Sequence, residues 1–250
     1  MNHQQQMIEM CKVLRLPSIR QLLQDENIFK EYPKASDFLY YALTKEQEDR
    51  QVRARTNRIR LAQFPEKKLL EELEMEALPQ NAAARLPILK ELTFITEKQN
   101  VLLIGSPGTG KTHVAIGLGI EACLAGYKVL FTTIHSLVNQ LKESRSERTL
   151  RIFEKKFENY DLVILDELGY ISFDQEGAEL LFSLLSLRAG RGSLIITSNL
   201  SFDRWGEVFH DPILTSALTD RLTHRAYIVN MIGDSYRILE TQKWIETQDF

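Results

Sequence analysis

The sequence has only two cysteines, Cys11 and Cys123, and it begins without a basic-then-apolar secretion signal. Two cysteines do not make a disulfide framework, and the polar start from Met1 to Gln6 lacks the apolar stretch of a signal peptide. No apolar run comes near the roughly 18 residues that a membrane-spanning helix needs. These absences exclude a membrane protein and predict a cytoplasmic protein with free thiols.

The chain also has no excess of positive charge, because 34 acidic residues outnumber 31 basic ones and the formal net charge is -3. Proteins are attracted to nucleic acids by phosphate charge, so the overall composition argues against DNA unless a local basic stretch reverses it. The five histidines and two cysteines show neither a metal-ligand spacing nor a triad-like arrangement. Chemistry through a Cys, Ser or His nucleophile is therefore not predicted.

The length of 250 residues suits one large domain, or one domain with a small appendage. Turn-forming residues gather at Leu78-Pro79-Gln80-Asn81 and mark a boundary there. Upstream, apolar residues recur at helical spacing among charges, which predicts a small all-α domain over residues 1–77 that contacts a partner or DNA. Downstream, residues 78–250 alternate compact apolar runs with amphipathic stretches, as in strands joined by crossover helices.

The downstream part is predicted to be an α/β domain with a five-stranded parallel sheet between helices, because its apolar runs look buried on both faces. The predicted strands cover residues 100–104, 128–133, 162–165, 193–198 and 226–231. The predicted helices cover residues 111–125 and 176–189, and residues 136–159 are expected to be mostly helical.

A phosphate-binding loop, the Walker A motif, lies between the first strand and its helix. Its glycines let backbone N–H groups converge on phosphate oxygens, and the helix that follows adds the positive end of its dipole. Lys111 is expected to contact the β and γ phosphates, and the Thr112 hydroxyl is expected to help hold Mg²⁺. A dinucleotide-binding loop is excluded because it needs the Gly-x-Gly-x-x-Gly spacing. The residues expected to bind nucleotide are Gly105, Ser106, Pro107, Gly108, Thr109, Gly110, Lys111, Thr112 and His113.

An adjacent pair of acids, Asp166 and Glu167, follows the apolar strand Leu162–Leu165. A carboxylate at that strand end suits a direct or water-mediated Mg²⁺ contact, which assigns Asp166 to the metal. Glu167 can then polarise the attacking water, and an adjacent Asp-Glu pair favours an ATPase over a GTPase. The alternative is that both acids only cap the next helix.

A further strand ends in Thr197-Ser198-Asn199. Nucleotides bind at the carboxyl ends of strands in such sheets, so a polar residue there is placed to sense the γ-phosphate or its water. Asn199 is the best candidate for that role. Ordinary turn chemistry is the alternative, since Asn is common where a strand runs into a loop.

Two local basic stretches reverse the inference from net charge. Helical spacing would put several arginines of the first on a common side, and acids dilute the second. Neither stretch has interleaved aromatic residues, which favours contact with the DNA backbone over sequence readout, with salt-bridged solvent-facing helices as the alternative. The predicted DNA-binding residues are Arg50, Arg53, Arg55, Arg58 and Arg60 in the first stretch and Lys142, Arg145 and Arg148 in the second.

The order of these motifs resembles AAA+ ATPases of the helicase-loader and initiator branch. Within that branch, the match narrows to the IstB-like ATP-binding proteins encoded by insertion sequences, and it is strongest from about residue 98 to 238. The segments that carry this resemblance are Asp166–Tyr170, Gly177–Phe182, Thr197–Asn199, Trp205–Phe209, Asp220–Leu222 and Gly233–Arg237.

The resemblance implies a transposition helper that uses ATP and Mg²⁺, oligomerises on DNA, and recruits or stimulates the transposase of the same element. It also implies that Arg221 is an arginine finger supplied in trans to a neighbouring subunit, and that Arg237 reads nucleotide within its own subunit. The chain departs from the family pattern at Arg188-Ala189-Gly190 and at His224-Arg225. Both departures put a subunit or DNA contact in doubt and leave the nucleotide residues untouched.

Two other functions stay open on the sequence. A helicase loader for DNA replication would use the same ATPase core, with residues 1–77 docking a replicative helicase. A nucleotide-gated structural clamp would bind ATP without cleaving it. The second is disfavoured because Lys111, Asp166 and Glu167 are all present, and a clamp does not need all three.

Overall fold

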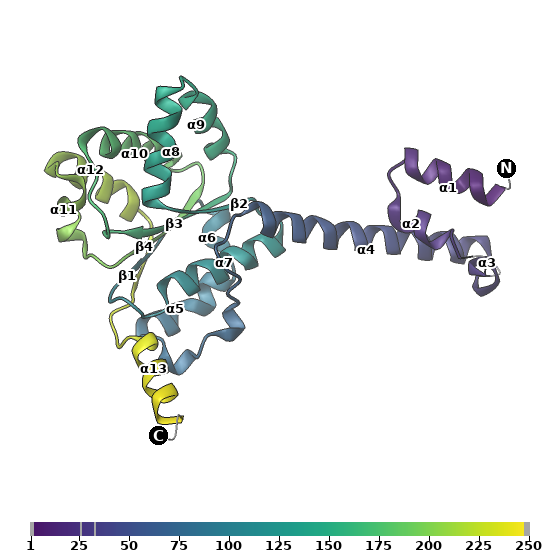
Figure 1. The fold of residues 1–250 in the computed structure, drawn as a ribbon, viewed down its shortest axis with the longest axis horizontal. Helices are drawn as coiled ribbons and strands as arrows, with labels where there is room; N and C mark the ends of the chain where they lie inside the picture. The colour runs from purple at the N-terminus through teal and green to yellow at the C-terminus, as the bar shows by residue number, and fades with distance from the viewer. Residues whose placement is uncertain (1–2, 26, 33, 248–250) are drawn as a thin grey trace. The chain divides into compact units, whose positions relative to one another are not determined.

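The computed structural model describes residues 3–25, 27–32 and 34–247 (Figure 1). The chain forms two compact units, Met1–Asn57 and Arg58–Phe250. The sequence predicted a boundary at residue 78, twenty positions after the division between these units. Leu70 and Leu78 explain the difference, because both are buried in the apolar core of the second unit.

The first unit contains α1 (His3–Val13), α2 (Pro17–Leu22), α3 (Ile28–Glu31) and most of α4 (Ala35–Leu61). Glu46 of α4 is buried, and its carboxylate accepts hydrogen bonds from the backbone N–H groups of Ser18 (2.8 Å) and Ile19 (3.3 Å) at the start of α2. Burial alone would raise the pKa of Glu46, but these bonds and the Arg50 guanidinium hold that pKa below its usual value. Glu46 therefore supplies the N-cap that α2 lacks in its own sequence.

The second unit is built on a five-stranded sheet in the order β2-β3-β4-β1-β5, and every pairing in it is parallel. This confirms the predicted fold class. Because parallel strands run the same way, all of them end at one edge, where ligands of such sheets bind. The strands are β1 (Val101–Ile104), β2 (Val129–Thr133), β3 (Leu162–Leu168), β4 (Ser193–Ser198) and β5 (Tyr227–Asn230).

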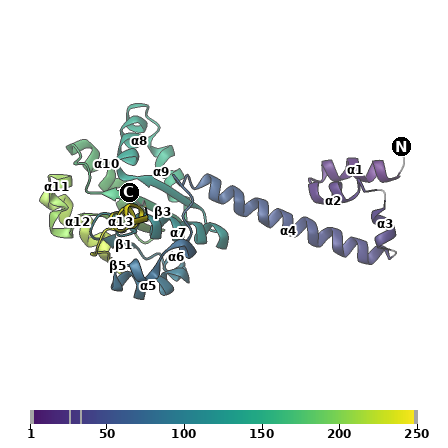
Figure 2. The same ribbon diagram turned by 60° about the horizontal axis from the view of Figure 1, so that its bottom comes forward.

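Two apolar cores lie on the two faces of this sheet. Val101 and Leu103 belong to the core shared with α5 (Gln80–Lys90) and α7 (Lys111–Ala125). Leu102 between them belongs to the core shared with α8 (Ile134–Ser146), α10 (Gln175–Arg188) and α12 (Pro212–Thr223). This alternation is the strand period of two, and Figures 1 and 2 show the two helical layers on opposite sides of the sheet. The first layer holds η1 (Leu70–Glu72), η2 (Met75–Ala77), α5 (Gln80–Lys90), α6 (Thr93–Thr96) and α7 (Lys111–Ala125).

In the second layer, residues 136–159 are mostly helical, as predicted, and they are divided between two helices. Arg148 has a φ of 61°, in the left-handed region, so the chain turns between α8 and α9. The elements here are α8 (Ile134–Ser146), α9 (Leu150–Glu158), α10 (Gln175–Arg188), η3 (Phe202–Arg204), α11 (Gly206–Phe209) and α12 (Pro212–Thr223), and the chain continues after β5 into α13 (Tyr236–Thr247).

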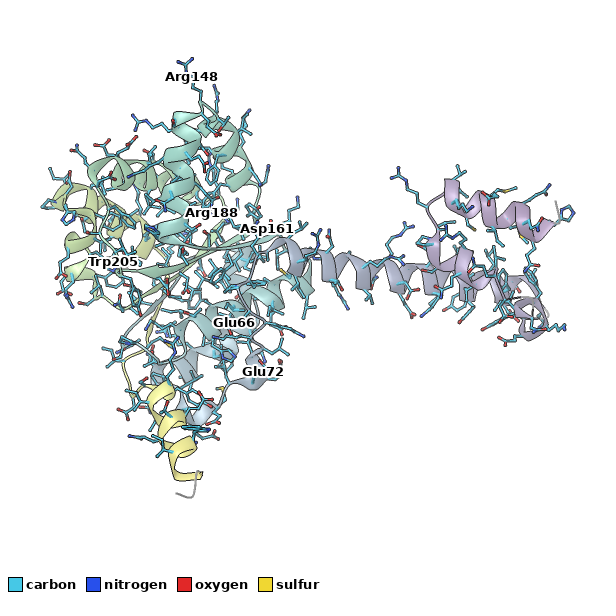
Figure 3. The ribbon with its side chains drawn as sticks, viewed as in Figure 1. Glu66, Glu72, Arg148, Asp161, Arg188 and Trp205 are labelled. Carbon is cyan, nitrogen blue, oxygen red and sulfur yellow. The ribbon has the colours of Figure 1, made fainter. Side chains whose placement is uncertain are left out.

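Arg188, at the end of α10, ties this layer to the sheet from inside the protein (Figure 3). Its guanidinium donates hydrogen bonds to the carbonyls of Phe157 (3.0 Å), Tyr160 (2.8 Å) and Ser193 (3.1 Å). Burial lowers the pKa of Arg188 to about 10, against the opposing effect of nearby Asp161. Arg188 therefore has a structural role. Of the helices described, none combines the length and the apolar character needed to cross a membrane.

Candidate nucleotide-binding site

The Walker A loop curls between β1 and the start of α7. Gly108 (φ 79°) and Gly110 (φ 86°) lie in the left-handed region, and Gly110 is the residue directly before α7. Glycine is favoured there because a side chain would strain the backbone. The loop therefore ends at the N-terminus of a 15-residue helix, the arrangement that binds phosphate through backbone N–H groups.

The Lys111 ammonium lies inside this loop. It donates hydrogen bonds to the carbonyls of Gly105 (2.9 Å) and Ser106 (2.6 Å), and the residue is only 8% exposed. Burial lowers the pKa of Lys111, nearby Asp166 opposes that effect, and Arg237 adds to it. A buried cation next to a second cation favours an anionic ligand, so the loop fits a nucleotide phosphate.

The Asp166 carboxylate lies beside the loop, in the C-terminal half of β3. It is buried and accepts hydrogen bonds from the Thr112 hydroxyl, at 3.1 Å and 3.2 Å to its two oxygens, and from the Thr197 hydroxyl. A carboxylate and a hydroxyl are hard oxygen ligands, and Mg²⁺ is commonly held by one or two such groups together with substrate phosphates. The residues present therefore fit Mg²⁺. No cluster of three or more His, Cys, Asp or Glu that could hold a metal occurs among the described residues.

Glu167 has an unusual backbone. Its φ of 67° places a non-glycine residue in the left-handed region, and the β3–β4 register is broken between Leu165 and Leu168. Its amide donates to the Thr197 hydroxyl (3.0 Å), and the residue lines the cleft that the loop borders. Strained backbone of this kind recurs at functional sites, and a bulge can redirect a side chain. The structure thus brings the predicted base to the phosphate loop.

Asn199 also lines the cleft, just after β4. Its side-chain oxygen is buried, and no residue in the described part of the chain hydrogen-bonds to it. An unsatisfied buried polar atom beside a binding cleft is a candidate ligand contact. This position is compatible with the predicted sensing role.

The cleft has a volume of about 430 Å³ and is bordered by more than the predicted residues. His113, predicted to bind nucleotide, lines it and hydrogen-bonds through Nε2 to the Leu69 carbonyl (2.8 Å). That contact holds the segment before α5 beside the loop. The lining residues that sequence reasoning missed are Lys68, Glu72, Leu73, Glu74, Ala77, Leu78, Tyr170, Thr197, Tyr236 and Glu240.

Arg237 lies on α13 and borders the same cleft. The start of α13 is fixed by two bonds of Tyr236, whose amide donates to the Gly108 carbonyl (2.9 Å) and whose hydroxyl donates to Glu74 (3.1 Å). The structure therefore brings Arg237 near Lys111, as predicted for a residue that reads nucleotide within its own subunit.

Arg221 lies elsewhere, on the exposed surface of α12, and it does not line the cleft. Its guanidinium lies over the Phe182 ring, 4.8 Å from the ring centre, and donates a hydrogen bond to the Ser186 hydroxyl. Both partners belong to α10. The structure does not bring Arg221 to the nucleotide site of its own chain.

Most of the predicted DNA-binding residues have partners within the chain. Arg50 and Arg53 both pair with Glu46 at 3.2 Å, and Arg58 donates to the Cys123 carbonyl (2.7 Å). Lys142 pairs with Asp174 (2.6 Å) and Arg145 with Glu176 (3.4 Å), and Arg60 also has a contact within the chain.

Arg55 and Arg148 differ from these residues. Both are exposed, and neither has a partner among the residues that the structure describes. Figure 3 shows the Arg148 side chain projecting outward from the turn between α8 and α9. The two are the basic residues of the predicted sets with the fewest competing contacts.

Two kinds of residue in the cleft were missed by sequence reasoning. Thr197 was passed over in favour of Asn199, although a hydroxyl at the same strand end was a usable signal. The segment from Lys68 to Leu78 gave no such signal, because its residues reach the cleft only through packing against α7.

A Walker A loop after β1, an acidic pair in β3 and the strand order β2-β3-β4-β1-β5 together define a P-loop protein of the AAA+ class. Residues 10–243 match the family described as IstB-like ATP binding protein. The chain belongs to that family.

Two relatives agree with this membership, and a solved structure agrees with the fold. The chain is 39% identical to an insertion sequence IS5376 putative ATP-binding protein of Geobacillus stearothermophilus, over 85% of each chain. It is 38% identical to an insertion sequence IS21 putative ATP-binding protein of Pseudomonas aeruginosa, over 83% of this chain and 78% of that one. A structure of the replication initiator DnaA bound to AMPPCP and single-stranded DNA is similar with a TM-score of 0.58 at 21% identity, over 73% of this chain and 56% of that one. That last likeness shows the fold alone.

Proposed function

We propose that this chain is a Mg²⁺-dependent ATPase that assembles on DNA as a homo-oligomer and recruits or stimulates the transposase of the same insertion sequence. The observation that carries the ATPase part is the backbone of Glu167. A non-glycine residue held at a φ of 67°, next in sequence to the metal carboxylate and lining the cleft that the phosphate loop borders, is strained backbone of the kind that clusters at functional sites.

The residues of the site divide the work of hydrolysis. Lys111 and the α7 N-terminus bind phosphate oxygens, and Thr112 and Asp166 supply oxygens for the metal. Mg²⁺, when bound, neutralises charge on the phosphates. Glu167 accepts the proton of the attacking water, and the Asn199 amide orients that water or the γ-phosphate.

Arg221 completes the site in a neighbouring subunit. Support comes from its exposure, its absence from the lining of the cleft in its own chain, and the contacts with Phe182 and Ser186 that fix its guanidinium. A fixed guanidinium loses little freedom when it reaches a partner. The homo-oligomer is therefore a requirement of turnover.

DNA binding is supported by the two exposed arginines without partners, Arg55 and Arg148. Lys142 and Arg145 can also contribute, because their ion pairs with Asp174 and Glu176 are exposed, and exposed pairs are worth only about 0–1 kcal/mol and can be exchanged for phosphate contacts. Binding of this kind is directed at the backbone, with little sequence specificity.

The salt dependence of DNA binding tests this assignment. We expect affinity for a fluorescent duplex to fall steeply with salt, and Arg55→Gln or Arg148→Gln to reduce the slope of log K against log [salt] by about 1 each. Arg204→Gln removes an exposed arginine that pairs with Glu207 outside both basic stretches and should leave the slope unchanged. A flat salt response of the unmodified protein would exclude the backbone contact.

The transposase part is supported by the relatives, which are named as insertion-sequence proteins. We expect strand transfer by the element's own transposase to increase when this chain and ATP are both added, measured on a labelled donor end. Equal strand transfer with and without the chain would reject the role. Stimulation of a replicative helicase instead would favour the loader function, which the fold alone does not separate from transposition.

A further inference from the structure

We propose that Thr197 is a positioning residue that holds both acids of the nucleotide site in their working orientation. Thr197 is the last residue but one of β4, is 2% exposed and lines the cleft. Its hydroxyl donates to an oxygen of Asp166 and accepts the amide hydrogen of Glu167 at 3.0 Å. One side chain thus contacts the metal carboxylate and the backbone of the base. The inference rests on the proposed ATP hydrolysis.

The strand register explains why a threonine is needed at this position. Leu165 pairs with Ile196 and Leu168 pairs with Ser198, so Asp166 and Glu167 of β3 together face the single residue Thr197 of β4. Two residues opposite one is the definition of a β-bulge. A bulge leaves some backbone groups without a hydrogen-bond partner on the neighbouring strand. At this bulge the Thr197 hydroxyl accepts the hydrogen bond of the Glu167 amide.

The same hydrogen bond fixes the direction of the Glu167 side chain. A glutamate at a φ of 67° is in a conformation that non-glycine residues rarely adopt, and surrounding contacts must maintain it. The hydrogen bond to Thr197 is donated by the Glu167 amide nitrogen, which is one of the atoms that define the φ torsion. Without this hydrogen bond, the Glu167 backbone can relax to a more common conformation, and its carboxylate can then leave the cleft.

The bond to Asp166 has a separate effect. Asp166 is buried and accepts hydrogen bonds from two hydroxyls, of Thr112 on α7 and of Thr197 on β4. Thr112 is expected to turn to the metal, whereas Thr197 has no such second role. Thr197 therefore keeps the carboxylate oriented while Thr112 serves the metal.

The test compares two hydroxyls on one strand. Thr197→Val keeps the shape and removes the hydroxyl, and Thr197→Ser keeps the hydroxyl. Ser198→Ala is the matched control, because Ser198 is 1% exposed and, among the described residues, its hydroxyl bonds only to backbone groups of Leu168 and Leu200. We expect Thr197→Val to lower kcat by about a hundredfold with little change in KM for ATP, and Thr197→Ser to restore most of it. Ser198→Ala should keep kcat even where it lowers the melting temperature.

A second readout needs no nucleotide. Hydrogen exchange of the peptide that contains Glu167 should be faster in Thr197→Val than in the unmodified chain or in Ser198→Ala, because only the first loses the acceptor of the Glu167 amide. If Thr197→Val does not fold, Thr197→Ala takes its place in both measurements.

The outcomes separate this inference from the proposed function. No ATP turnover by the unmodified protein on DNA would remove the proposed function itself. An active protein in which Thr197→Val keeps its kcat, or in which Ser198→Ala loses as much kcat as Thr197→Val, would overturn the positioning role alone. A raised KM with unchanged kcat would also overturn it, because that result assigns Thr197 to nucleotide binding.

Discussion

Glu167→Gln is expected to lower the rate of ATP hydrolysis by about 10² to 10⁴, because the amide cannot accept the proton of the attacking water. ATP binding should persist, since the phosphate contacts come from Lys111 and the α7 N-terminus. The measurements are phosphate release at saturating ATP and binding of a fluorescent ATP analogue.

Glu207→Gln is a suitable control for Glu167→Gln. Glu207 is exposed and pairs only with Arg204, away from the cleft, so its substitution should leave phosphate release unchanged. Hydrolysis that survives Glu167→Gln would remove this residue as the base and leave the strained backbone without a catalytic explanation.

Arg221→Ala is expected to have an effect of similar size through a different route. An arginine supplied by a neighbour contributes about 10³ to 10⁵ in the GTPase precedents, because it stabilises charge that develops on the transferred phosphate. ATP binding and folding should change little, since Arg221 is exposed and lies outside the cleft. Phosphate release and binding of the ATP analogue, measured on the same preparation, give the two quantities.

Loss of ATP binding in Arg221→Ala would contradict this role, because a finger acts on the transition state. Arg204→Ala serves as the control, as it removes another exposed arginine that is bonded to an acid three residues further along the chain. It should hydrolyse ATP at the unmodified rate.

The sheet and the phosphate loop were predictable because their signals are local. An apolar run followed by glycines at fixed spacing and a lysine specifies strand, loop and helix within a short stretch. The two acids of β3 were predictable for the same reason, since they directly follow an apolar run and a parallel sheet brings the carboxyl ends of its strands to one edge. The place of Asn199 at the cleft was also predictable from local sequence, because Asn199 directly follows an apolar strand.

The bulge at Asp166 and Glu167 was not predictable, because it depends on the register between two strands separated by a helix. The sequence prediction ended the strand at Leu165, whereas β3 continues to Leu168. A regular strand would have pointed the two acids to opposite faces of the sheet. The bulge and the Thr197 hydroxyl allow neighbouring acids to serve one site.

The pattern of charges along the sequence located the basic stretches, but it did not show which of their residues are paired within the chain. Glu46 and Arg50 are four residues apart and form a helical ion pair, but the burial of Glu46 against the start of α2 comes from tertiary packing. Arg53 also pairs with the buried Glu46 carboxylate, so part of the basic stretch has a structural role. The role of the rest in DNA binding stays a prediction.

Mixing two inactive variants tests most directly whether ATP is hydrolysed at a site shared by two subunits. Lys111→Ala subunits keep Arg221 but lack the phosphate contact, and Arg221→Ala subunits keep the phosphate contact but lack the finger. In an equal mixture on duplex DNA, about one quarter of the sites combine an intact loop with an intact finger from the neighbour, so phosphate release should recover to about one quarter of the unmodified rate. A mixture as inactive as each variant alone, alongside an active unmodified protein, would contradict the shared site.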